Sequence, residues 1–169
     1  MTTTEASNPL FTHGHHPRFT AITPESVREA IPSLLETAST EFDAFENSIE
    51  PTWEGIFARQ RRILEPLGYA WQITSHLMGV LNSDALRQVH EEMLPKVIEF
   101  YTKLGQSKPV YKALEALKNG EGWNQLSAAQ QRILDKELIG MKLSGISLEG
   151  AEKERYNAME KELAELSTG

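Results

Sequence analysis

Metal binding is the first chemistry that the histidines of this sequence suggest. His13, His15 and His16 stand within four residues, and three imidazoles so close together could hold a divalent cation. The nearest carboxylates in the sequence are Glu5 and Glu25, and the glycine and proline around the cluster indicate an irregular segment. We therefore expect no physiological metal site at this cluster.

A second histidine begins an incomplete zinc motif. The motif H-E-x-x-H places two imidazoles one helical turn apart, with the glutamate beside a zinc-bound water. The sequence here is His90-Glu91-Glu92-Met93-Leu94, so leucine stands where the second zinc ligand would be. This zinc site cannot form. We expect a solvated helix face that carries an acidic pair.

The remaining reactive residues do not assemble into a catalytic group. His76 ends an apolar stripe without an obvious nucleophile or carboxylate at partnering spacing, so we predict a partly buried, hydrogen-bonded histidine. Arg59, Arg61 and Arg62 form a run too short to predict a phosphate site in an acidic protein. Three tryptophans are more typical of core or interface anchors than of ligand cages: Trp53, Trp71 and Trp123. From residue types alone we expect no catalytic, cofactor-binding or metal-binding residue in this chain.

Composition limits the possible partners. The chain has 169 residues, a formal net charge of -7 and no cysteine. This length favours one domain, and the negative charge argues against nucleic-acid and anionic-membrane partners. Without cysteine there are no disulfides, thiolate metal sites or cysteine nucleophiles. No apolar run is long enough to cross a membrane, and the first residues do not resemble a secretory signal, so the cytoplasm is the default expectation.

Apolar residues recur at helical spacing through most of the chain, and no segment alternates as a strand would. Good N-cap residues precede several of these stripes: Thr23, Thr52, Ser83 and Ser127. We therefore expect helices over residues 24–45, 52–81, 83–104, 108–118, 127–138 and 148–166. Pro32, Pro66 and Pro95 fall inside the first three, where we expect a kink or a restart.

The predicted fold is all-α, an antiparallel bundle of about five to six helices, some of them kinked at proline. Residues 24–169 form its single helical domain, and a helical hairpin within 71–87 is its centre. Residues 1–23 are expected to form an extended arm that lies in a groove on this body, because Pro9, Gly14 and Pro17 interrupt any helical period. Its apolar residues are Leu10, Phe11, Phe19 and Ile22.

Short motifs follow one another in a characteristic order along nearly the whole chain. They are Asn8-Pro9-Leu10, Phe19-Thr20-Ala21-Ile22-Thr23-Pro24-Glu25, Thr52-Trp53-Glu54, Ser75-His76-Leu77 with Val80 and Asn82-Ser83, Leu86-Arg87, Leu94-Pro95, and Leu143-Ser144-Gly145-Ile146-Ser147-Leu148 followed by Arg155-Tyr156. This order resembles the N-terminal region of the oligopeptidase A branch of the thimet-oligopeptidase family of zinc metallopeptidases.

The resemblance implies an almost wholly helical fold with two lobes around a deep channel. It places the zinc site of the parent enzyme on an H-E-x-x-H helix far downstream of this region, so zinc belongs to the parent and not to this chain. The implied role is a non-catalytic helical portion that covers the substrate channel and restricts it to short peptides. Its implied partners are the catalytic lobe and, in the full enzyme, short peptides. We expect this chain alone to be inactive.

A lobe that docks on a larger one should expose an apolar face when it is alone. We expect this at the N-terminal arm and on the last helix, where Tyr156, Met159, Leu163 and Leu166 form a seam. The candidate channel-facing or interface residues are these four together with Trp71 and His76. A homo-oligomer formed through such a face is therefore a further expectation.

Two other hypotheses remain open at this point. One is a free-standing helical module that binds a protein partner or itself, without peptidase activity. The other is a small helical enzyme whose site is spread over several helices and leaves no motif. A peptidase lobe needs the missing lobe for activity, a module needs only a partner, and a scattered site needs a pocket with converging polar groups.

Overall fold

The computed structural model describes residues 8–12 and 16–166, except for the side chain of Glu165, and this part is helical without a β-strand. The all-α prediction is confirmed. The helices are α1 (Pro24–Glu46), α2 (Arg59–Val80), α3 (Asp84–Gly105), α4 (Lys108–Asn119), α5 (Ala128–Leu143) and α6 (Gly150–Leu166). Short 3-10 turns are η1 (Pro9–Phe11), η2 (Phe19–Ala21) and η4 (Glu121–Gln125), and η3 (Glu54–Ala58) is a π-helical segment that leads directly into α2.

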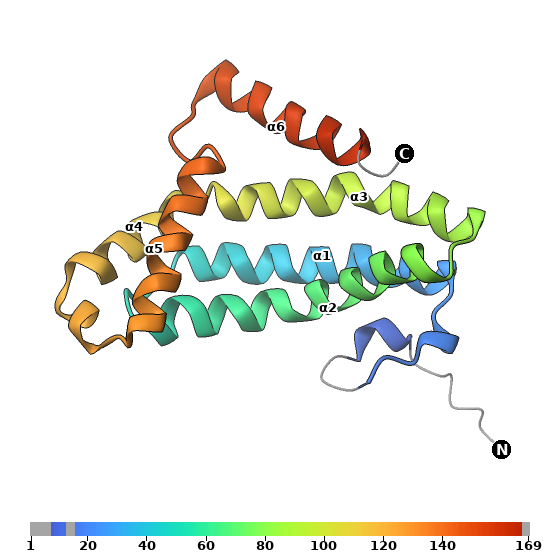
Figure 1. Ribbon diagram of the computed structural model, residues 1–169, viewed down its shortest axis with the longest axis horizontal. Coiled ribbons are helices and arrows are strands. Elements are labelled where there is room, and N and C mark those ends of the chain that lie inside the picture. Colours follow the sequence, from blue (N-terminus) through green and yellow to red (C-terminus); the bar gives the residue numbers. More distant parts are fainter. Residues whose placement is uncertain (1–7, 13–15, 167–169) are drawn as a thin grey trace.

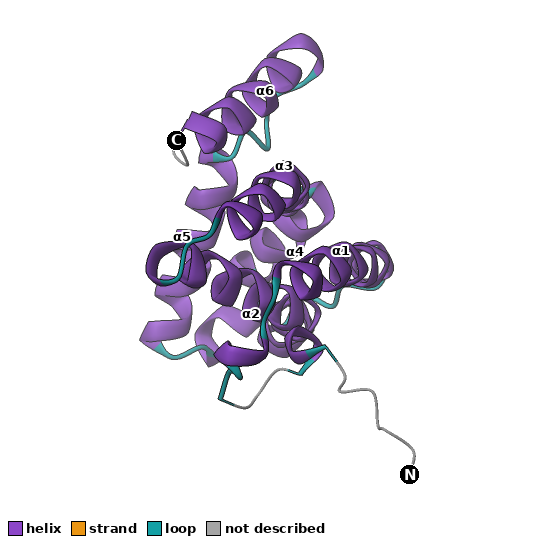
Figure 2. Cartoon of the chain, turned by 90° about the vertical axis from the view of Figure 1, so that its right-hand side faces the viewer, coloured by secondary structure: helices purple, strands orange, loops and turns teal. Residues whose placement is uncertain are grey.

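Three antiparallel helices form the body of the molecule. Helices α1, α2 and α3 lie side by side in Figure 1, and Figure 2 looks nearly along them. Helices α4 and α5 pack together across one end, and α6 packs on the outside of α3. The largest fully buried side chains come mainly from α1, α2, α3 and α4, and they include Phe42, Phe45, Ile31, Leu67, Val97 and Leu114. Burial of this apolar surface is what stabilises the bundle.

The predicted helix starts are present as hydrogen-bonded caps. Thr23 Oγ1 accepts from the Ser26 N–H and Ser83 Oγ accepts from the Leu86 N–H, while Ser127 forms the predicted capping box. Each cap satisfies backbone N–H groups that have no partner within their own helix. Pro32, Pro66 and Pro95 do lie inside α1, α2 and α3, but all three helices are continuous, so no helix restarts at Pro32.

The N-terminal segment differs from the predicted extended arm, because its described part forms two short 3-10 turns. Asn8 explains the first turn, since its Oδ1 accepts from the Leu10 N–H at 3.1 Å and its Nδ2 donates to Ser26 O at 2.8 Å. Leu10 is buried against α1 and α2, whereas Phe11 and Phe19 are exposed. The apolar face that we expected on the N-terminal arm is therefore covered at Leu10 and open at these two phenylalanines.

Several helix ends differ from the prediction. Helix α5 ends at Leu143, five residues beyond the predicted end at residue 138. Leu81, the last residue of the predicted 52–81 helix, is exposed, because α2 ends at Val80 and Leu81 adopts a non-helical backbone conformation. Helix α3 ends at Gly105, one residue beyond the predicted end, and Gln106 caps it.

Candidate functional site

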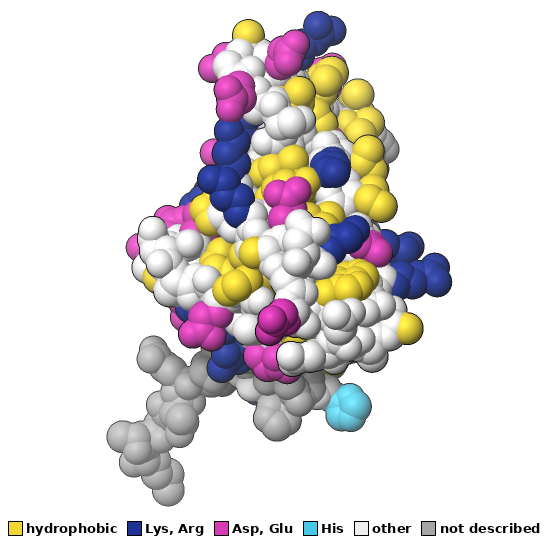
Figure 3. Space-filling model, turned by 90° about the vertical axis from the view of Figure 1, so that its left-hand side faces the viewer, with side chains coloured by type: hydrophobic (Ala, Val, Ile, Leu, Met, Phe, Trp, Pro, Cys, Tyr) yellow, Lys and Arg dark blue, Asp and Glu magenta, His cyan; other side chains and the backbone are white. Residues whose placement is uncertain are grey.

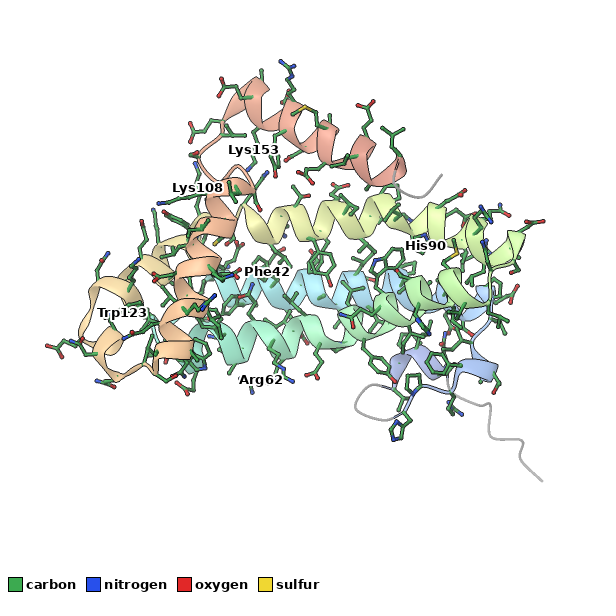
Figure 4. All side chains as sticks on the ribbon, in the orientation of Figure 1. Phe42, Arg62, His90, Lys108, Trp123 and Lys153 are labelled. Atoms are coloured by element: carbon green, nitrogen blue, oxygen red, sulfur yellow. The ribbon has the colours of Figure 1, made fainter. Side chains whose placement is uncertain are left out.

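The end of the α2–α3 hairpin brings an indole, an imidazole and a hydroxyl together. The rings of Trp71 on α2 and His90 on α3 stack with centroids 4.5 Å apart and an interplanar angle of 14°. Ser75 lies one helical turn after Trp71, and its Oγ is 3.4 Å from His90 Nε2. These groups line a surface pocket of about 410 Å³ (Figure 4 labels His90). The pocket therefore combines aromatic walls with polar hydrogen-bonding groups.

The prediction of a solvated helix face is wrong for His90. Glu91 and Glu92 are exposed as expected, but His90 is only 6% exposed, because the Trp71 ring of the neighbouring helix covers it. Burial lowers the pKa of His90 below its ordinary value, and the nearby Glu91 carboxylate opposes this shift. The imidazole is therefore neutral at pH 7. Its Nδ1 atom is buried and has no hydrogen-bond partner among the described residues.

The Ser75–His90 pair lacks the third group that would make it a catalytic triad. A serine nucleophile needs a base, and that base needs a partner that fixes its orientation and tautomer. The far nitrogen of His90 has no such partner, so no carboxylate orients the ring. The arrangement of the described residues is suited to hold a ligand and not to activate a nucleophile.

His76 is exposed, although the sequence predicts a partly buried histidine. Its ring lies beside the N-terminal segment, with the Phe19 ring 5.8 Å away at 53°. Leu77 points into the core, and His76, one position earlier on the helix, lies on a different face of α2. The structure thus does not bring His76 into the pocket with Trp71.

The seam on α6 forms a second candidate surface, on a different side of α3. Met159, Leu163 and Leu166 are 50%, 65% and 73% exposed, whereas Tyr156 is half-buried and donates a hydrogen bond to Leu143 O at 3.2 Å. In Figure 3 hydrophobic side chains gather along one side of the α6 end of the molecule. The seam therefore presents apolar side chains to solvent.

Polar contacts attach α6 to α3. Gln106 Nε2 donates to Asn157 Oδ1 at 2.8 Å, and Lys161 Nζ lies 3.1 Å from Glu99 Oε2. Between α1, α3 and α6 a groove of about 720 Å³ remains, with Leu35 and Phe100 among its apolar residues. No residue of α6 whose side chain is described is buried. These polar side-chain contacts hold α6 on α3, and the groove between α1, α3 and α6 stays open.

Arg59 and two of the tryptophans have structural contacts. Arg59 donates to Ser48 O at 2.7 Å and its guanidinium lies 5.2 Å from the centroid of the Phe45 ring, so it is a packing residue. Trp53 stacks on Phe57 at 4.2 Å. Trp123 packs against the core with Lys118 Nζ 5.8 Å from its ring centroid. These contacts agree with the predicted anchor role.

Metal ligands do not converge in the described part of the chain. No group of three histidine, cysteine, aspartate or glutamate side chains there is placed to hold a metal ion. His16 is exposed, and His13 and His15 of the histidine cluster lie outside the described residues. The described residues therefore do not fit the zinc that the resemblance implies for the parent enzyme. None of these helices combines the length and apolar character required to cross a bilayer.

Comparison with known proteins points to the same family as the sequence motifs. The family described as Neurolysin/Thimet oligopeptidase, N-terminal domain, matches residues 31–153. The probable cytosolic oligopeptidase A of Arabidopsis thaliana is 35% identical over 164 residues, which is 97% of this chain and 23% of that protein. The organellar (chloroplastic/mitochondrial) oligopeptidase A of Arabidopsis thaliana is 34% identical over 164 residues, which is 97% of this chain and 21% of that protein.

A bacterial relative gives a similar result. Oligopeptidase A of Escherichia coli (strain K12) is 33% identical over 161 residues, which is 95% of this chain and 24% of that protein. The chain thus spans about a quarter of the length of the curated relatives it matches. With its ordered motifs and helical fold, it belongs to the family of neurolysin and thimet oligopeptidase N-terminal domains.

Proposed function

We propose that this chain is the non-catalytic N-terminal helical part of a zinc-dependent oligopeptidase and covers the channel through which short peptides reach the active site. The observation that carries the proposal is the family match over residues 31–153 in a chain whose relatives are about four times longer. In such an enzyme the zinc would activate the attacking water. The residues of this chain would limit access to the channel and would bind no metal.

The α6 seam is the surface through which we expect the rest of the enzyme to dock. Exposed apolar side chains on one helix face are typical of a surface that a partner covers. Met159, Leu163 and Leu166 are spaced by four and three residues and so share one side of α6. The catalytic lobe is the proposed partner. For the location we propose the cytoplasm, and one relative is described as cytosolic.

The test combines an activity assay with a mass measurement. The purified 169-residue chain is incubated with zinc and with short peptides that carry a fluorophore and a quencher. We expect no hydrolysis and no stoichiometric zinc. The product of the gene in its source cells should be several times heavier than 19.0 kDa and should hydrolyse the same peptides. Zinc-dependent hydrolysis by the 169-residue chain would contradict the proposal.

The exposed seam also favours a second candidate, a free-standing module that associates through α6. This candidate predicts a gene product of about this size and a dimer that forms in sedimentation velocity as concentration rises. Leu163→Glu should then abolish the dimer, because a charge would enter the apolar contact. The matched control is Ala158→Glu, which adds the same charge at an exposed position on another side of α6.

A further inference from the structure

The pocket at the end of the α2–α3 hairpin has the size and lining of a ligand site. Its volume of about 410 Å³ lies within the range of about 300–1,000 Å³ that is typical of small-molecule pockets. Apolar side chains form one part of the lining, namely Trp71, Met78 and Leu94. Polar side chains form the other part, namely Ser75, Asn82, Arg87 and His90. Such a pocket suits a ligand with an apolar body and a polar end.

The buried His90 determines which polar end fits. A neutral imidazole carries one N–H, and only Nε2 has a partner, the Ser75 hydroxyl. A buried N–H without an acceptor is rarer in proteins than a buried acceptor without a donor, so the proton belongs on Nε2. His90 then donates to Ser75 Oγ. The hydroxyl hydrogen of Ser75 remains free to donate to a ligand.

The other polar groups of the pocket are donors as well. Arg87 forms no ion pair with a carboxylate of the described residues, although Glu91 stands one turn further along α3. Its guanidinium offers several N–H groups in the geometry that suits a carboxylate. The Asn82 amide adds two N–H donors beside its one carbonyl acceptor. Neither Asp84 nor Glu91 lines the pocket. The donors that line the pocket therefore suit an anion.

We propose that this pocket binds the terminal carboxylate of a short peptide whose last residue is aromatic or aliphatic. The carboxylate is held by Ser75, Asn82 and Arg87, and the last side chain packs against the apolar wall around Trp71. The choice of a peptide among apolar carboxylates rests on the proposed function. The choice of a carboxylate rests on the pocket alone.

The test is an NMR titration of the 169-residue chain with N-acetylphenylalanine and with N-acetylphenylalaninamide, which lacks the carboxylate. The acid should shift the Trp71 indole N–H and the His90 ring nitrogens, assigned from Trp71→Phe and His90→Gln, and the amide should not. Arg87→Gln should weaken binding of the acid about tenfold or more, because a hydrogen bond between charged groups is lost. Arg62→Gln removes the same charge from an exposed position on α2 (Figure 4) and should leave binding unchanged.

Ser75→Ala should weaken binding several-fold, whereas Ser33→Ala, at an exposed site on α1, should not. Ser75 and Arg87 are exposed, so their variants are expected to fold, which circular dichroism checks. Three results would each overturn the proposal: equal binding of acid and amide, equal effects of Arg87→Gln and Arg62→Gln, or no shifts up to the solubility limit of the acid.

The two proposals fail in distinguishable ways. Carboxylate binding by this chain, together with a gene product that hydrolyses no peptide, would remove the proposed function and leave the pocket as a carboxylate site. A gene product that is an active peptidase, with no shift at Trp71 or His90 in the titration, would remove the pocket proposal alone.

Discussion

The α1–α3 bundle and helix α6 differ in what covers their apolar residues. In the bundle, side chains such as Phe42 and Leu67 are fully buried by neighbouring helices of the same chain. On α6, Met159, Leu163 and Leu166 are at least half exposed, and no described side chain of this helix is buried. The bundle is stabilised by its own apolar surface, whereas α6 is held by polar contacts to α3.

This difference separates the residues that stabilise the isolated chain from those that stay exposed in it. Burial of apolar area contributes about 25 cal/mol per Å², so exposed side chains on α6 contribute little to the stability of the isolated chain. Their apolar surface becomes favourable only when another surface covers it. Changes in the bundle should therefore reduce global stability, and changes on α6 should mainly affect association.

The largest expected effect is that of Phe42→Ala. Phe42 is 0% exposed and packs at 5.7 Å from the ring of Phe45, so its truncation leaves a cavity in the core. We expect the free energy of unfolding to fall by about 3–5 kcal/mol. Leu163→Ala on α6 should change it by about 0.5 kcal/mol or less. Urea denaturation of both variants measures the contrast, and equal losses would show that α6 belongs to the same core.

Gly55→Ala tests how closely the chain packs where it enters α2. A Cβ at Gly55 would lie 2.5 Å from Glu50 O and 2.7 Å from Thr52 Oγ1, so the backbone has to shift. We expect a loss of about 1–3 kcal/mol. The control is Gly140→Ala on α5, where a Cβ meets nothing within 4 Å and the variant should gain about 0.5–1 kcal/mol. Thermal unfolding of the two variants should therefore shift in opposite directions.

Gln106→Ala should loosen α6 without weakening the bundle. The buried Gln106 amide donates to Ser144 O at 2.9 Å and to Asn157 Oδ1 at 2.8 Å, and so joins the end of α3 to α6 and to its connecting segment. Losing these bonds should reduce local stability of α6 by about 1–2 kcal/mol. Hydrogen exchange should become faster in α6 and stay unchanged in α1–α3. The same loss of protection in both regions would contradict the comparison, and Gln88→Ala on the exposed side of α3 is the control.

The sequence was sufficient wherever the signal is local. Thr23 and Ser127 predict the starts of their helices correctly, because a cap involves residues only three positions apart. The α6 seam follows in the same way from helical spacing. The burial of His90 was missed because it depends on Trp71, which reaches it from another helix. The turn at Asn8 was missed although its cap is local, because a three-residue turn is too short to show a helical period. The bond that holds Asn8 on α1 spans 18 residues.

The smallest expected effect is the pH dependence that His90 confers on the bundle. Burial holds its pKa below the ordinary value, so below about pH 6.5 the unfolded chain binds a proton that the folded imidazole does not. The stability contribution is complete above that pH and is lost as pH falls through the folded pKa. Among the groups around the ring, Trp71 and Ser75 of α2 are uncharged and Glu91 only reduces the shift.

His90→Gln should therefore remove this part of the loss of stability below pH 6.5, and the difference between wild type and variant isolates it from the other titrating groups. Urea denaturation at several pH values between 7 and 5 measures the difference. Gln88→Ala removes no titratable group and retains His90, so it should keep the wild-type slope. If His90→Gln also kept the wild-type slope, the imidazole would be solvated in solution, and the pocket beside Trp71 would lose the neutral donor that orients Ser75.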